Sequence, residues 1–114
     1  MNIELLYIDG CPSWTVALSR LAHVLENCGL GDEPVDLVRV STNEQARSIN
    51  FRGSPTIRIN GHDPFPCPGD CLLTHCCPDT GLPCRVYVTP DGIAGAPTTD
   101  QLIHAILQAD DYLN

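Results

Sequence analysis

The most constraining feature of the sequence is a strand pattern that runs almost directly into a helix pattern near the N-terminus. In residues 2–9, polar and apolar side chains first alternate and are then mostly apolar, which is typical of a strand buried on at least one face. From residue 13, apolar side chains recur at steps of three and four as far as Cys28. Gly29 can then end the helix, because glycine readily adopts the left-handed conformation. Such a helix has to pack its apolar side against a sheet, which indicates an α/β protein.

The rest of the chain continues to alternate strands with helices. We expect a strand at 35–40, a short helix opened by a Ser41–Glu44 capping box and ending near Asn50, a strand at 56–60 followed by an Asn-Gly turn, a strand within CRVYVTPDG, and a last helix opened by a Thr98–Gln101 capping box. The first two strands should be parallel through a right-handed crossover, and the last two should form a hairpin. This order predicts an α/β fold for the single domain 1–114, with a four-stranded mixed sheet and helices on both faces.

Charge and hydropathy exclude several classes of partner. Six basic and fourteen acidic side chains give a formal net charge of -8, which opposes binding to phosphate backbones and to anionic membrane surfaces. No apolar run approaches the roughly 20 residues that cross a bilayer, and the N-terminus lacks the basic start of a signal sequence. We therefore expect a cytoplasmic protein that binds neither nucleic acid nor membranes.

Seven cysteines are many for 114 residues, and an odd number leaves at least one outside internal disulfides. In a reducing compartment such cysteines are more often catalytic, redox-sensing or metal-binding than structural. Cys11 lies at the junction of the first strand and the first helix, whereas Cys28 lies at the far end of that helix. About 25 Å of helix separates the two, so we expect Cys28 to be a core residue and not a partner of Cys11.

The other five cysteines belong to a cysteine-rich insertion, residues 61–83, and to the residue that follows it. A hairpin connection is usually two to five residues long, so this insertion needs something to hold it. Thiolates with His62 or His75 could supply four ligands to zinc, although paired Cys-x-x-Cys knuckles are missing. One or two disulfides, or free thiols, are the alternatives. The candidate cysteines are Cys67, Cys71, Cys76, Cys77 and Cys84.

Cys84 begins the fourth predicted strand, which we expect to run antiparallel to the third. This arrangement would place Cys84 at the end of the sheet opposite Cys11, about 17–20 Å away. The sequence therefore predicts two separate sites, one around Cys11 and one around the insertion.

Three stretches, DGCPSW, FRGSPTI and CRVYVTPDGIAGAPT, resemble the thioredoxin-like superfamily. Within it they look like a group of small bacterial thioredoxin-family proteins, some labelled alkylmercury-lyase-like. The resemblance implies that Pro55 is cis, that Cys11 and Pro55 face each other at one end of the sheet, and that Ser54 offers backbone groups to an extended substrate. Trp14 stands where the second cysteine of Cys-x-x-Cys would be, and Leu5 stands near the expected buried acid. These departures argue against ordinary dithiol reductase activity.

The position of Cys11 favours a reactive thiol. It precedes the first turn of a helix, where Pro12 is well tolerated and where unpaired N–H groups and the helix dipole stabilise a thiolate. The nearby carboxylate of Asp9 would oppose this. In the alternative interpretation Cys11 is a small buried hydrophobe. Trp14 either packs its helix on the sheet or restricts access to the sulfur.

Three functions are compatible with these patterns. In the first, Cys11 is the single nucleophile of a monothiol oxidoreductase, with Pro12, Trp14, Ser54 and Pro55 around it. A small thiol, a partner protein or an insertion cysteine would then supply the second sulfur. In the second, the chain is a metal-binding or metal-sensing module whose insertion cysteines and His75 bind zinc or a soft metal such as mercury. In the third, it is a structural adaptor with inert thiols.

Overall fold

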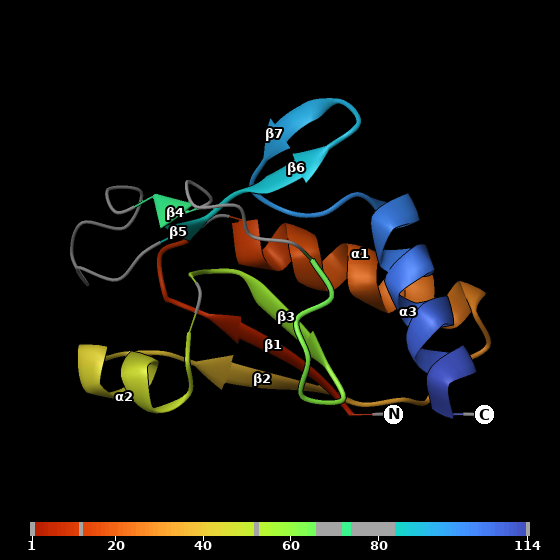
Figure 1. The fold of residues 1–114 in the computed structure, drawn as a ribbon, viewed down its shortest axis with the longest axis horizontal. Coiled ribbons are helices and arrows are strands. Elements are labelled where there is room, and N and C mark those ends of the chain that lie inside the picture. The colour runs from red at the N-terminus through yellow and green to blue at the C-terminus, as the bar shows by residue number, and fades with distance from the viewer. Residues whose placement is uncertain (1, 12, 52, 66–71, 74–83, 114) are drawn as a thin grey trace.

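The computed structural model describes residues 2–11, 13–51, 53–65, 72–73 and 84–113. Figure 1 shows these residues as a mixed α/β fold in which a central sheet is accompanied by three helices and two small hairpins. The elements in chain order are β1 Ile3–Tyr7, α1 Ser13–Asn27, β2 Val35–Arg39, α2 Asn43–Ser48, β3 Thr56–Ile59, β4 Leu72–Leu73, β5 Cys84–Arg85, β6 Tyr87–Thr89, β7 Gly92–Ala94 and α3 Thr99–Leu113. Within the described residues, no helix is long and apolar enough to cross a membrane.

The central sheet has three strands in the order β2-β1-β3. β1 and β2 are parallel, with Ile3 opposite Val35, as the crossover through α1 predicts. β1 and β3 are antiparallel, with Ile3 opposite Ile59. Asn60 and Gly61 follow β3 with φ of 54° and 81°, the left-handed conformation that a two-residue hairpin turn requires. The α/β class and the parallel first pair of strands are therefore confirmed.

The predicted fourth strand does not join this sheet, which corrects the four-stranded sheet expected from the sequence. β6 pairs instead with β7, with Val88 opposite Ile93, and β5 pairs with β4. The turn in TPDG explains the change, because the Thr89 hydroxyl donates to the Gly92 carbonyl and the chain folds back on itself. The Val88 carbonyl also accepts a hydrogen bond from the Gln101 side chain of α3. The described part of the chain thus has a three-stranded mixed sheet and a separate β6–β7 hairpin (Figure 1).

The core lies between the sheet and the helices α1 and α3, which lie side by side in Figure 1. α1 ends in a Schellman motif: the Leu30 N–H donates to the Leu25 carbonyl, and Gly29, with φ of 76°, donates to Glu26. Cys28 is half-buried against the core, as expected. The buried core side chains of these elements are Ile3, Leu5, Ala17, Leu21, Val24, Leu25, Ile57, Ile59, Leu102, Ala105 and Ile106.

The short helix α2 begins one residue later than the sequence analysis placed it. Thr42 is its N-cap and accepts a hydrogen bond from the Gln45 N–H, whereas the Ser41 N–H donates to the Gln45 side chain. Gln45 also donates to the Arg39 carbonyl, which ties the helix to the end of β2 and selects this box over Ser41–Glu44. Ala46 packs against a second apolar cluster, formed by Ile8, Cys11 and Val40.

The last helix begins as predicted. The Gln101 N–H donates to the Thr98 hydroxyl at 3.1 Å, and the Thr98 N–H donates to the Gln101 side chain at 2.9 Å. We expect Thr98→Ala to lower the free energy of unfolding by about 1 kcal/mol, because an N-terminal N–H of α3 loses its acceptor. Urea denaturation of wild type and variant measures the difference. Thr99→Ala, one residue into the helix, is the matched control and should change stability less.

Candidate thiol site

Cys11 lies on the connection between β1 and α1, the position that the sequence analysis assigned to a reactive thiol. Its N–H donates to the Ile8 carbonyl at 3.3 Å, which continues the end of β1 into a turn. The residue is 4% exposed and packs in the cluster with Ile8 and Val40. Its thiol donates to the Ser54 carbonyl, with 3.7 Å between sulfur and oxygen. Pro12, the next predicted site residue, is outside the described residues.

Ser54 and Pro55 meet Cys11 from the start of β3. The peptide bond between them is cis, the isomer that the resemblance implies. Ser54 is fully buried, and its hydroxyl accepts the Ile8 N–H at 3.1 Å. Both the hydroxyl and the carbonyl of Ser54 therefore bind the end of β1, and this is what brings the two loops together. Cys11 and the Ser54–Pro55 pair are adjacent, as expected.

The Ser54 carbonyl also accepts the Arg85 N–H at 2.9 Å. This contact corrects two expectations. The carbonyl that the resemblance offers to an extended substrate is taken by the chain itself. The backbone of Cys84, one residue earlier, lies at the Cys11 end of the molecule and not at the opposite end. The physical reason is that β5 pairs with β4 and β6 pairs with β7, while Arg85 bonds to Ser54, two residues before β3.

A buried arginine anchors this contact. Arg85 is 1% exposed, and both terminal nitrogens of its guanidinium bind the Asp63 carboxylate. The guanidinium also donates to the Phe65 carbonyl at 2.9 Å and lies 4.5 Å from the centre of the Tyr87 ring. Its Nε has no partner among the described residues. Arg85 thereby joins residues 63–65, at the start of the cysteine-rich insertion, to the strand that follows the insertion.

Tyr87, the first residue of β6, contacts Pro55. Its hydroxyl donates to the Pro55 carbonyl at 2.5 Å, and its ring stands edge-on to Phe65 with centroids 5.4 Å apart. Burial raises the pKa of Tyr87 well above its ordinary value of 10.0, although the Arg85 cation acts in the opposite direction. Neither Arg85 nor Tyr87 was predicted as a site residue, because both occur within a strand pattern. The one available signal was a charged residue inside the apolar run CRVYV.

The remaining neighbours of Cys11 on α1 and β2 serve in packing and surface pairing. Trp14 is half-buried, stacks on Tyr7 with ring centroids 4.2 Å apart, and packs against both apolar clusters. This arrangement agrees with the packing interpretation of Trp14. The Asp9 carboxylate pairs with Arg39 at 3.1 Å on the surface, where both side chains are more than half exposed.

The predicted metal ligands cannot be assembled into a site from the described residues. Cys67, Cys71, His75, Cys76 and Cys77 are outside them, and for Cys84 the structure describes the backbone alone. His62 follows the Asn60–Gly61 turn and is exposed; its backbone pairs with Ile59. The described residues contain no group of three or more His, Cys, Asp or Glu side chains able to hold a metal ion. Zinc binding by the insertion stays a prediction.

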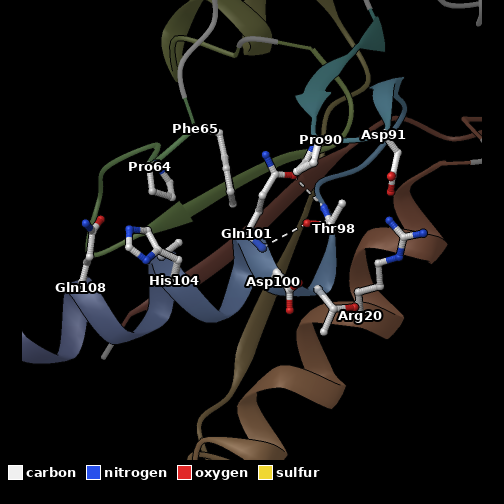
Figure 2. Close-up of a pocket in the computed structure, with 12 residues that line it drawn as sticks. Arg20, Pro64, Phe65, Pro90, Asp91, Thr98, Asp100, Gln101, His104 and Gln108 are labelled. Carbon is white, nitrogen blue, oxygen red and sulfur yellow. Dashed lines mark hydrogen bonds between the residues drawn. The ribbon is translucent and has the colours of Figure 1, made fainter.

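A cavity of about 760 Å³ lies beside the first turns of α3 (Figure 2). Its lining includes Arg20, which donates to the Pro97 carbonyl at 2.9 Å, and Thr98 and Gln101, which cap the helix. Arg20 thus ties α1 to the residue before the α3 cap, and Thr98 and Gln101 are occupied in capping α3. The described lining contains none of the predicted thiol or metal residues, and we place the candidate site at Cys11.

The chain matches no protein-family model, no curated protein and no solved structure. The likeness to thioredoxin-like proteins therefore depends on the three sequence stretches and on the position of Cys11 beside Ser54.

Proposed function

We propose that the chain is a thioredoxin-like protein that uses Cys11 as a single nucleophilic thiol in thiol–disulfide exchange. One observation carries the proposal: the Cys11 sulfur contacts the backbone carbonyl of Ser54, the residue before Pro55. Residues far apart in the sequence therefore hold the thiol against a buried backbone carbonyl. The resemblance implies the same closeness of the thiol to a cis Ser54–Pro55 pair.

The proposed reaction begins when the Cys11 thiolate attacks one sulfur of a disulfide and releases the other as a thiol. A second thiol then attacks the mixed disulfide and restores Cys11. The Trp14 position has no sulfur, so this second thiol comes from outside the first helical turn. The low exposure of Cys11 means that a substrate reaches the sulfur only after a local opening of the surrounding chain.

The chain should accelerate exchange between glutathione and a small disulfide, and Cys11→Ser should reduce the rate to that of the uncatalysed reaction. Cys28→Ser is the matched control, since Cys28 is the other cysteine whose side chain is described and it packs against the core near the end of α1. That variant should keep the wild-type rate. The rate of exchange is measured from the appearance of the thiol that the disulfide releases. A Cys11→Ser protein that retains the wild-type rate would overturn the proposal.

A second readout identifies the reacting residue. Cleavage before aspartate and after arginine isolates Cys11 in the fragment 9–20 and Cys28 in the fragment 21–31. After brief exposure to glutathione disulfide, Cys11 should lose its free thiol before Cys28 does, as measured by alkylation and mass spectrometry. If Cys11 and Cys28 lose their free thiols at the same rate, Cys11 behaves as an inert core residue.

A further inference from the structure

Cys84 immediately precedes Arg85 in β5, and this puts its backbone at the Cys11 site. We propose that Cys84 is the resolving thiol of Cys11: it displaces the small thiol from a mixed disulfide on Cys11 and leaves an internal disulfide between residues 11 and 84. The inference rests on the proposed function, because Cys11 has to form the mixed disulfide first. The sequence left three sources for the resolving thiol: a small thiol, a partner protein or a cysteine of this chain. The inference assigns this role to Cys84.

The juxtaposition comes from a shared acceptor. The Ser54 carbonyl oxygen contacts the Cys11 sulfur at 3.7 Å and the Arg85 nitrogen at 2.9 Å. The Cys11 sulfur and the Arg85 nitrogen, which both contact this oxygen, are therefore less than about 7 Å apart. The Arg85 nitrogen belongs to the peptide bond that follows Cys84. The fold thus brings the backbone of Cys84 close to the Cys11 sulfur.

The position of Cys84 is fixed by the next residue. Arg85 is held by the partly buried Asp63 carboxylate, and by the Phe65 carbonyl and the Tyr87 ring, which belong to core residues. Figure 1 shows β5 beside the connection from β1 to α1, where Cys11 lies. A thiol anchored to the same part of the fold acts at an effective concentration far above that of a thiol diffusing from solution. Cys28 lacks this advantage, because the length of α1 separates it from Cys11.

The burial of Cys11 makes an internal partner more effective than an external one. At 4% exposure, the sulfur admits an external thiol only when the chain around it opens. The mixed disulfide needs one such opening to form, and resolution by an external thiol would need a second. Attack from the neighbouring β5 segment does not require a second molecule to enter the site.

The complete reaction balances in sulfur, protons and electrons. The Cys11 thiolate attacks a low-molecular-mass disulfide, forms an S–S bond to one half and releases the other half as a thiol. The Cys84 thiolate then attacks the Cys11 sulfur, and the second half leaves as a thiolate that takes up the proton lost by Cys84. Two protein thiols are oxidised to one disulfide, and one small disulfide is reduced to two thiols. Excess small thiol reverses both steps.

Disulfide mapping on the wild-type protein tests the inference. Cleavage before aspartate and after arginine places Cys84 alone in the fragment 79–85, apart from Cys67 in 63–69 and from the other insertion cysteines in 70–78. After reaction with glutathione disulfide, the fragment 9–20 should be linked to 79–85. In Cys84→Ser, the mixed disulfide of glutathione on Cys11 should persist and become the main product. Cys28→Ser, the matched control, should give the wild-type map.

The outcomes separate this inference from the proposed function. A wild-type Cys11 that stays in a glutathione mixed disulfide, or that links to 63–69 or 70–78, overturns the role of Cys84 and leaves the exchange function standing. A Cys11 that keeps its free thiol overturns both. The wild-type map decides the matter even when Cys84→Ser fails to fold, because it needs no variant.

Discussion

Replacement of Arg85 by methionine is expected to lower the free energy of unfolding by about 3–5 kcal/mol. The side chain is almost completely buried, and its removal strands the Asp63 carboxylate, which is only 14% exposed, without its counter-ion. Hydrogen bonds to the Phe65 carbonyl and the contact with the Tyr87 ring are lost at the same time. Urea denaturation at neutral pH measures the loss.

A surface ion pair of the same composition provides the control. Arg39 and Asp9 pair at 3.1 Å with side chains 59% and 65% exposed, so Arg39→Met should cost about 0–1 kcal/mol. The double variant Arg85→Met with Asp63→Leu should recover much of the loss, because no unpaired charge then remains buried. Equal effects of Arg85→Met and Arg39→Met would contradict the anchoring role of Arg85.

The second large effect is a loss of stability at alkaline pH caused by Tyr87. Burial raises the pKa of this phenol in the folded protein, whereas in the unfolded chain it ionises near 10. Above that pH the unfolded state loses a proton that the folded state retains. The free energy of unfolding therefore falls, by about 1.4 kcal/mol per pH unit, until the folded-state pKa is reached.

Tyr87→Phe tests this assignment. It removes the titrating group and should flatten the decline above pH 10, while costing about 1 kcal/mol at neutral pH because the Pro55 carbonyl loses its donor. All six basic side chains are arginines, so no lysine titrates in the same range. Urea midpoints between pH 8 and 11.5, measured with reductant, give the two curves. Parallel curves for wild type and variant would assign the alkaline loss to another group.

Local features of the fold could be predicted because each depends on a few neighbouring residues. The Gly29 stop, the Asn60–Gly61 turn and the Thr98–Gln101 box all formed where their residue types require them. The partner of residues 84–89 could not be predicted, because strand pairing is decided by distant contacts. The Ser41–Glu44 and Thr42–Gln45 boxes are offset by one residue, and a hydrogen bond from Gln45 to the end of β2 decided between them.

The candidate site was predictable in part. The closeness of Cys11 to Ser54 followed from the resemblance, and the structure places the two in contact. Arg85 was missed because arginine inside a strand pattern normally points to solvent, and its partner Asp63 stands 22 residues earlier. The error about Cys84 had the same origin. Antiparallel pairing with the third strand would have carried it to the far end of the sheet, whereas the buried ion pair draws it to Ser54.

The contact between Asp63 and Arg85 has a consequence for how this protein can change over evolution. It joins the two stems from which the cysteine-rich insertion departs and to which it returns. This ion pair and the Phe65 hydrogen bond join the stems directly, so these contacts do not depend on the length of the span between them. Each doubling of such a span costs only about 0.6 kcal/mol of closure entropy. Selection is therefore free to vary the insertion while the thiol site stays in place.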